Sequence, residues 1–364
     1  MSRSHIINML YAFSLGFFSI KLNLLLGGVL VIDTLFRMRV GKPSAKLIFS
    51  ISLLILFTLL FYIIGWSNLP KLGLVERFVF ILFTLLLVPL LSVRVKSHEL
   101  IPVLNAFVWG MLAYSIPIVL TSFLKGGYGY GLLFNPWTLM EMNSPSVSND
   151  FALISAFLIL FGLDRWKLSS AILLVVVLIC GIYVGGRTFL LIYFLSLIFV
   201  IFNDLSLKRV IIFVPIVMLS LMSFFAFGLD RLIFARFYEV GLDSARFELF
   251  IQAILAIPNH PYGGFEPNSY SYKGEWFHNF YLDTASTSGW YPLIVAIFLS
   301  VYILKFIFQN YQRRFFYLFL FVILIMSQDV IMEANLKPFL FFVFLSSLLF
   351  RRSLKTVLPE RLLS

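Results

Sequence analysis

The sequence is poor in charge and almost without cysteine. Only 12% of its 364 residues are Asp, Glu, Lys or Arg, and Cys180 is the one cysteine. Soluble domains carry about 25% charged residues, and small secreted domains depend on several disulfides, so both classes are excluded. The apolar runs are long and unbroken, which also excludes the alternating pattern of an outer-membrane barrel.

The sequence also lacks the short motifs of nucleotide and metal chemistry. It has no Walker A loop, no Rossmann fingerprint, no G-x-S-x-G elbow, and no D-x-D motif to hold a nucleotide sugar through a cation. His260 and His278 are too far apart in sequence to match the close H-x-x-x-H spacing of two metal ligands on one helix. We therefore expect neither a metal nor another cofactor.

Apolar residues make up most of the chain. They account for 61% of it, with 43 Phe and a mean hydropathy of +0.98. Since a spanning helix needs about 20 apolar residues, we predict an all-α integral membrane protein with 11–12 transmembrane helices. The first two segments are short and could form one irregular span. The predicted spans are 6–20, 22–36, 46–65, 72–92, 101–123, 150–164, 168–184, 188–203, 208–227, 288–308, 314–331 and 336–350.

Basic residues gather on one side of these spans. That side has 18 of the 28 basic residues and five of the 17 acids, a net of +13; the other side has ten and twelve, a net of −2. The positive-inside rule makes the basic side, with Arg94, Asp33 and Glu99, cytoplasmic together with both termini. Residues 1–21 lack the cleavage site of a signal peptide. The net charge of +11 thus reflects topology, and nucleic acid is not an expected partner.

Two outer loops are long, at 124–149 and 228–287, whereas bundled helices are usually joined by about 2–8 residues. We divide the chain into 1–227, with nine transmembrane helices and the first long loop; 228–287, a large periplasmic loop with the candidate active site; and 288–364, with three transmembrane helices and a basic cytoplasmic tail. Long loops on a rigid scaffold often carry function.

The large loop contains an amphipathic helix. Asp243 or Ser244 can cap its start, Pro258 ends it, and Glu248 and Gln252 lie on one face. Another face is an apolar stripe with helical spacing, which we expect to lie along the membrane surface. The stripe consists of Phe247, Phe250, Ile251, Ile254 and Leu255.

Arginines mark two candidate anion sites on the outer side. Gly185 and Gly186 precede Arg187 where one predicted span ends and the next begins. The exposed N–H groups and the helix dipole can bind phosphate there, or the turn is structural and Arg187 reaches the lipid headgroups. In the large loop, we expect Arg231 and Arg236 to pair with nearby acids, and Arg246 to be functional.

Histidine and carboxylates supply the candidate proton-transfer groups. His260 and His278 are two of only four histidines, and His278-Asn279 stands just before the chain re-enters the membrane. A neutral imidazole can activate a hydroxyl near pH 7, although His278 could equally hydrogen-bond the loop.

A later group of polar residues stands at the outer end of a predicted span. Asp329, Glu333 and Asn335 either line a polar substrate cavity or mark an ordinary helix end.

The order of these pieces resembles the O-antigen polymerase and O-antigen ligase superfamily of bacterial envelope glycosyltransferases. The resemblance rests on ten to twelve spans, the Gly-Gly-Arg187 turn, and a late outer loop. That loop carries Arg246, a helix, the turn from Asn259 to Gly264, and His278-Asn279 before Ser288-Gly289-Trp290. The architecture covers nearly the whole chain, while the specific motifs cover only 185–188 and 244–290.

The resemblance implies a GT-C-like fold and glycans on undecaprenyl pyrophosphate as substrates, at the periplasmic face of the inner membrane. Arg187 and Arg246 would bind the pyrophosphate and His278 would be the base, with no metal. Gly185, Gly186, His260, Asn279, Asp283 and Glu333 would support them. Asp283 or Glu275 could instead orient the histidine or serve as the base. Membrane lipid and a polysaccharide chain-length regulator are further implied partners.

Polymerase and ligase differ in the acceptor, which is a second lipid-linked repeat unit or the lipid A core. We favour an inverting polymerase, with the ligase as the near alternative. A flippase for lipid-linked oligosaccharides would share the hydropathy, but transporters place their polar groups near the bilayer midplane.

Overall fold

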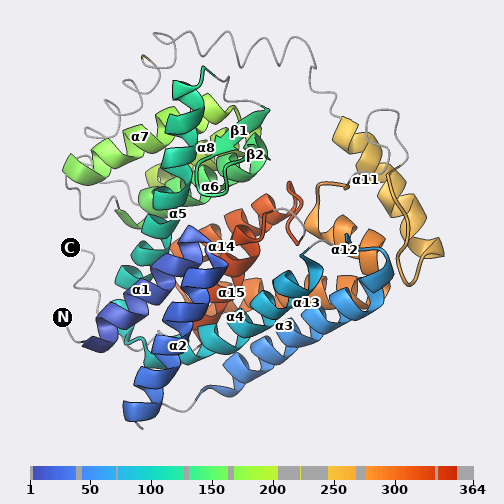
Figure 1. Ribbon diagram of the computed structural model, residues 1–364, viewed down its shortest axis with the longest axis horizontal. Helices are drawn as coiled ribbons and strands as arrows, with labels where there is room; N and C mark the ends of the chain where they lie inside the picture. Colours follow the sequence, from blue (N-terminus) through green and yellow to red (C-terminus); the bar gives the residue numbers. More distant parts are fainter. Residues whose placement is uncertain are drawn as a thin grey trace. The chain divides into compact units, whose positions relative to one another are not determined.

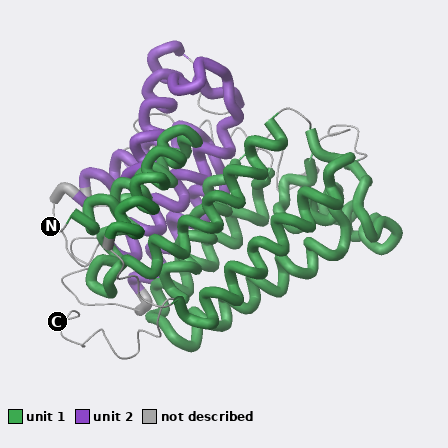
Figure 2. Tube along the Cα trace, turned by 60° about the horizontal axis from the view of Figure 1, so that its bottom comes forward, with its two compact units in different colours: residues 1–107, 245–364 green, residues 108–244 purple. Residues whose placement is uncertain are grey.

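The computed structural model describes residues 3–37, 43–70, 73–126, 131–162, 168–203, 222, 245–267, 276–332 and 335–350. These residues are mostly helical, which confirms the predicted helical class, and two short strands are the exception. Figure 1 shows the helices coloured along the chain. The chain divides into two compact units, drawn in green and purple in Figure 2.

Unit 1 comprises residues 1–107 and 245–364. It therefore joins the N-terminal helices to the segment that contains both candidate histidines and to the last helices. Its elements are α1 (Arg3–Phe17), α2 (Ile20–Arg37), α3 (Ala45–Ile64), η1 (Gly65–Ser67), α4 (Leu74–Arg94), η2 (Ser97–Glu99), the first part of α5 (Leu100–Leu124), α11 (Ala245–Ala256), η5 (Ile257–Asn259), α12 (Phe280–Ser288), α13 (Trp290–Asn310), α14 (Arg313–Met326) and α15 (Lys337–Phe350).

Unit 2 comprises residues 108–244 and contains the Gly-Gly-Arg turn. Within it, α6 packs against both α7 and α8. Its elements are the second part of α5, the antiparallel pair β1 (Leu132–Asn135) and β2 (Met140–Asn143), α6 (Ser144–Phe157), the π-helical turn η3 (Leu158–Gly162), α7 (Leu168–Val184) and α8 (Arg187–Asn203).

Five stretches within the described residues are long and apolar enough to cross a membrane. They are Ala45–Ser67, Leu74–Arg94, Ser97–Leu124, Ser144–Gly162 and Trp290–Asn310. A helix also forms at every other predicted span except 208–227, which lies outside the described residues apart from 222. Several of these helices are short: α14 and α15 have 14 residues each, or about 21 Å of helix against a hydrocarbon core of about 30 Å. The total of 11–12 spans therefore stays a prediction.

The structure differs from the predicted loops in two places. The loop at 124–149 is shorter than expected, because α6 begins at Ser144, and it contains the β1–β2 hairpin. The loop at 228–287 contains a second helix, α12, just before α13. Its sequence, FYLDTASTS, is short and polar, so hydropathy alone does not reveal it.

Aromatic rings form the core on which α12 sits. Phe280, the first residue of α12, lies 5.5 Å from Phe57 of α3 and 6.0 Å from Phe339 of α15, measured between ring centroids. All three side chains are almost completely buried. Offset and edge-to-face ring pairs of this kind add about 0.5–1.5 kcal/mol each beyond the area that they bury. The core therefore fixes the start of α12 relative to α3 and α15.

Candidate functional site

The turn before α12 is built around Asn279. Its side-chain oxygen accepts hydrogen bonds from the backbone N–H groups of Tyr281 and Leu282, at 3.0 and 3.3 Å. An N-cap of this kind stabilises a helix by about 1 kcal/mol. The amide nitrogen of Asn279 donates to the carbonyl oxygen of Ser327 at 3.1 Å, just after the end of α14. Asn279 thus caps α12 and ties the turn to the end of a second helix.

His278 has a left-handed backbone conformation. Its φ is +54°, and it is one of three described non-glycine residues with positive φ. This conformation costs an ordinary L-residue about 1–2 kcal/mol, so the surrounding structure must hold it. The side chain is partly buried. The sequence marks His278 as a candidate but carries no signal for its positive φ.

Asp283 binds the backbone on both sides of His278. One carboxylate oxygen accepts from the N–H of Phe277 at 2.7 Å, and the other accepts from the N–H of Asn279 at 3.1 Å. The Asp283 residue is 7% exposed. Each carboxylate oxygen therefore has a backbone donor, and the two donors flank the strained histidine.

His260 belongs to the same neighbourhood. Its ring lies 5.2 Å from that of Phe265, which lies 5.6 Å from that of Phe277. Phe265 and Phe277 belong to a small apolar core, against which α11 packs through Leu249 and Ala253. The core consists of Leu249, Ala253, Phe265, Phe277, Leu282 and Ala285. It brings α11 and the turns around the two histidines together within unit 1.

Gly289 lets the chain pass from α12 directly into α13. Its φ is +80°, and a Cβ at this position would lie 2.0 Å from the carbonyl oxygen of Pro261. The same oxygen accepts from the N–H of Trp290 at 3.0 Å. Only glycine fits this close approach, so the His260 turn and the start of α13 are locked to each other.

A very small pocket, with a cavity volume of about 10 Å³, opens beside Asp283. Rings of Phe61, Trp276 and Phe280 line it, together with residues 330–332 after α14. The pocket is therefore mainly apolar, with the carboxylate of Asp283 at one side.

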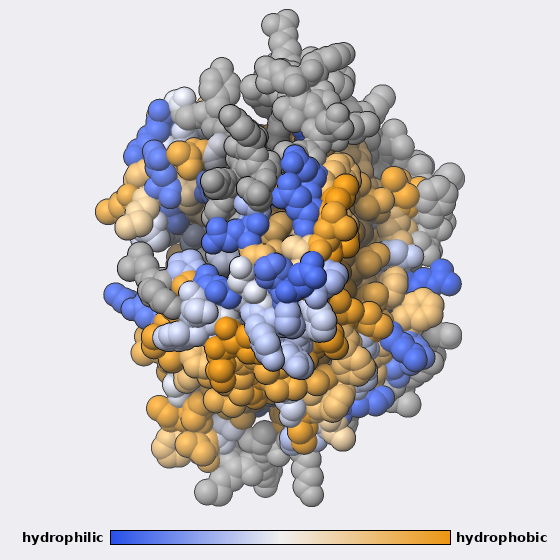
Figure 3. All heavy atoms as spheres, turned by 90° about the vertical axis from the view of Figure 1, so that its right-hand side faces the viewer, coloured by the Kyte–Doolittle hydropathy of each residue, from blue (hydrophilic) through white to orange (hydrophobic). Residues whose placement is uncertain are grey.

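The outward face of α11 is apolar. The predicted stripe is exposed, with Phe247 at 68%, Ile251 at 59% and Leu255 at 70% exposure, while Leu249 on the opposite face is fully buried. Glu248 and Gln252 lie along one edge and are joined by a 3.1 Å hydrogen bond. Figure 3 views the molecule from the side where α11 lies and shows apolar surface beside a patch of hydrophilic residues. The helix thus presents apolar side chains both to the protein and away from it.

The Gly-Gly-Arg turn lies in unit 2. Gly185, with φ of +73°, ends α7, and α8 begins at Arg187, which is partly buried. A Cβ on Gly186 would lie 1.6 Å from the hydroxyl oxygen of Ser148 on α6, so glycine is required. The Ser148 hydroxyl is buried and has no hydrogen-bond partner among the described residues. The chain before α8 therefore has no space for a side chain at position 186, because the hydroxyl of Ser148 lies there.

The structure brings the predicted residues together in two places. His260, His278, Asn279 and Asp283 lie in unit 1, and the Gly185–Arg187 turn lies in unit 2. Arg246 is on the first turn of α11, but its side chain lies outside the description. The predicted residues Arg231, Arg236, Glu275 and Glu333 are outside the described part of the chain.

Asp329 and Asn335 close the connection between α14 and α15. The Asn335 amide donates to the Asp329 carboxylate at 3.1 Å, and the other carboxylate oxygen accepts from the N–H of Val330 at 2.9 Å. Both residues are about 95% buried. Of the two alternatives for this pair, the geometry fits a structural role at a helix end.

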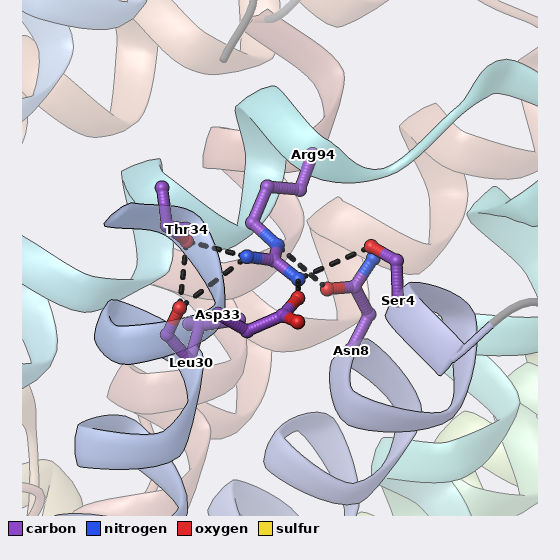
Figure 4. A network of polar contacts seen from close by, with 6 residues as sticks. All are labelled: Ser4, Asn8, Leu30, Asp33, Thr34 and Arg94. Carbon is purple, nitrogen blue, oxygen red and sulfur yellow. Dashed lines mark hydrogen bonds and ion pairs between the residues drawn. The ribbon is translucent and has the colours of Figure 1, made fainter. Parts of the chain in front are cut away.

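A buried charge network around Arg94 was not expected from the sequence. Figure 4 shows its guanidinium between α1 and α2, paired with Asp33 and hydrogen-bonded to Asn8, Thr34, Ser4 and the carbonyl oxygen of Leu30. The Arg94 and Asp33 side chains are 5% and 8% exposed. Arg94 and Asp33 are therefore not exposed charges of a cytoplasmic loop, as the topology prediction treated them. Because their charges are opposite, leaving both out does not change the net charge of +13 predicted for that side.

A second polar pair lies next to this network in sequence. His5 Nδ1 is 3.2 Å from a carboxylate oxygen of Glu99, and the other Glu99 oxygen accepts from the N–H of Lys96 at 2.8 Å. The Arg94 network connects the end of α4 to α2 and, through Ser4 and Asn8, to α1, and the His5–Glu99 pair connects α1 to η2. They fix the N-terminal helices within unit 1.

Among the residues that the structure describes, no three His, Cys, Asp or Glu side chains are grouped as metal ligands. The chain matches no protein-family model, and no curated protein is similar enough in sequence to count as a relative.

Proposed function

We propose that this chain is an O-antigen polymerase of a bacterial inner membrane. It transfers a growing glycan from undecaprenyl pyrophosphate to a sugar hydroxyl of another lipid-linked repeat unit, at the periplasmic face. The observation that carries the proposal is the turn at His278: a partly buried histidine with φ of +54°, held by a buried acid, one short helix before α13, which is long enough to span the membrane. Strained residues of this kind are concentrated at functional sites.

His278 is the base in this proposal. The acceptor hydroxyl oxygen forms a bond to the anomeric carbon of the donor, on the face opposite the pyrophosphate, and the hydroxyl proton passes to the imidazole. The bond from the anomeric carbon to the phosphate oxygen breaks, and its electron pair leaves with undecaprenyl pyrophosphate. The configuration at the anomeric carbon is inverted.

Arg187 and Arg246 neutralise the leaving pyrophosphate. Guanidinium binds phosphate oxygens in a bidentate way, and the first N–H groups of α8 add to the positive potential at Arg187. The tight contact between Gly186 and Ser148 supports this role, because it fixes the start of α8 and leaves a buried hydroxyl beside it. No step needs a metal, so we expect chain extension to continue in EDTA. Loss of activity that divalent metal restores would contradict this part.

The proposal includes a membrane orientation. Both termini are cytoplasmic, the chain crosses the membrane 11–12 times in a GT-C-like arrangement, and α11 rests on the outer leaflet. The exposed stripe of α11 supports this, because an apolar face directed away from the protein is suited to the lipid boundary. The donor lipid would then reach His278 within the plane of the membrane. A chain-length regulator protein is a further proposed partner.

The deciding experiment is the lipopolysaccharide pattern of the source bacterium after deletion of the gene. Core with a single repeat unit would establish a polymerase, because ligation still proceeds. Bare core, with long polymer left on the lipid carrier, would make the chain a ligase with the same site. An unchanged ladder would overturn both and favour the transporter. A His278→Ala copy that restores long chains would remove His278 from the chemistry.

A further inference from the structure

We propose that Asp283 is a positioning residue: its carboxylate holds the backbone of His278 in the left-handed conformation and thereby fixes the position of the imidazole. The catalytic part of this inference rests on the proposed function, in which His278 is the base. The structural part, that Asp283 offsets the strain at His278, is independent of it.

Two hydrogen bonds connect Asp283 to the backbone on either side of His278. The carboxylate of Asp283 spans the residue at 278, because its two oxygens accept from the N–H groups at 277 and 279. Those two N–H groups can point toward the same carboxylate when the residue between them has positive φ, as in the backbone nests that bind anions. Asp283 therefore stabilises the left-handed backbone conformation, which is unfavourable for a histidine.

The residues on both sides of the turn are tied to neighbouring elements. Asp283 sits on α12, whose start is capped by Asn279 and tied to the carbonyl oxygen of Ser327. Phe277 is buried in the small core beneath α11, so the chain is also fixed on the other side of the histidine. With both neighbours fixed, the backbone at His278 determines the direction in which the imidazole leaves the chain.

This arrangement distinguishes the two roles that the sequence leaves open for Asp283. A general base must direct an oxygen lone pair at the substrate hydroxyl, within about 2.6–3.2 Å. Both oxygens of Asp283 are instead engaged by backbone donors at 2.7 and 3.1 Å, and the residue is 7% exposed. The geometry assigns Asp283 to the support of His278.

The first test is a thermal-unfolding cycle on the full chain in detergent. Asp283→Asn keeps the size of the side chain but turns one acceptor into a donor that faces a backbone N–H. We expect it to lower Tm by about 2–4 °C. In a His278→Gly background we expect a drop larger by about half or more, because the histidine turn relaxes once the carboxylate no longer holds it and recovers part of the cost, whereas glycine has no such strain to release. Glu248→Gln, at an exposed acid on α11, is the matched control and should leave Tm within about 1 °C in both backgrounds. Equal drops for Asp283→Asn in the two backgrounds would overturn the inference.

The second test measures chain extension with purified protein and lipid-linked repeat units extracted from a strain that lacks the gene. If Asp283 positions the base, Asp283→Asn lowers kcat by about 10²-fold while KM and the acidic limb of the rate–pH profile stay unchanged. Loss of that limb would make Asp283 the base and overturn the inference. Thermal coupling together with full activity would support the hold on His278 and overturn the proposed role of His278 in catalysis.

Discussion

Two polar clusters of unit 1 use charge in opposite ways. At Arg94, an arginine and an aspartate from different helices neutralise each other, and the remaining guanidinium donors end on Ser4, Asn8 and two groups of α2 (Figure 4). At the His278 turn, Asp283 binds backbone N–H groups that flank a strained histidine. The first cluster joins helices, whereas the second maintains an unfavourable conformation of one residue. Buried charge alone therefore does not identify a functional site, and the conformation that it supports is the better guide.

The largest expected effect is on activity at the second cluster. His278→Ala removes the proposed base, so we expect chain extension to fall by about 10²–10⁴-fold, the usual contribution of general base catalysis. The amount of protein in the membrane should stay the same. Polymer length on a lipopolysaccharide gel and a blot of the membrane fraction check the two parts. Loss of the protein itself would place the histidine with Arg94 as a structural residue.

At the first cluster we expect a large effect on stability and none on chemistry. Arg94→Met leaves Asp33 as a buried charge without its partner, which should cost about 3–5 kcal/mol of unfolding free energy. A double variant that also carries Asp33→Leu should recover much of the loss, because neither charge then remains. Thermal unfolding of the purified variants measures both. Activity per folded molecule should match the parent protein, and a lower value would mean that the network also acts in catalysis.

A smaller effect is expected at the Gly-Gly-Arg turn of unit 2. Arg187→Lys keeps the charge but loses the proposed bidentate contact with phosphate, so we expect chain extension to fall about tenfold. Arg313→Lys, at an exposed arginine at the start of α14, is the control. Initial rates with lipid-linked repeat units compare the two. Equal rates would mean that Arg187 reaches the lipid headgroups and does not bind the substrate.

The smallest effect concerns the outward face of α11. In a Cys180→Ala background, Ile251→Cys should react several-fold more slowly with a membrane-impermeant maleimide than Gln252→Cys on the polar edge. The reason is that, in the proposed orientation, lipid covers the apolar stripe but not the edge. Labelling of intact spheroplasts, followed by a gel-shift assay, measures the ratio. A ratio near one would place both faces of α11 in water.

Much of the helical framework could be predicted from hydropathy. A described helix coincides with each predicted span except 208–227, because runs of about 15–25 apolar residues leave few alternatives. The helix α12 and the β1–β2 hairpin could not be predicted, since both are short and neither has a strong apolar period. Their formation depends on tertiary contacts, such as the Phe57, Phe280 and Phe339 core beneath α12.

The residues of the candidate site could be selected from the sequence, but their relations could not. His278, Asn279 and Asp283 are visible as polar residues before a span, yet no pattern in the sequence predicts that a histidine has positive φ. The pairing of Arg94 with Asp33 joins residues 61 positions apart, and a single sequence carries no signal for such a contact. For that reason the two residues looked like membrane-surface charges.

Hydrogen bonds at both ends of α12 restrict which insertions and deletions this helix can accept during evolution. At its C-terminal end the Asn68 amide donates to the carbonyl oxygen of Thr287, and the Ser288 hydroxyl donates to that of Phe61, each at 2.7 Å. A one-residue insertion or deletion in α12 would rotate Asp283 by about 100° relative to one of these ends. Related chains are thus expected to keep the length of this helix and to vary the surfaces around it.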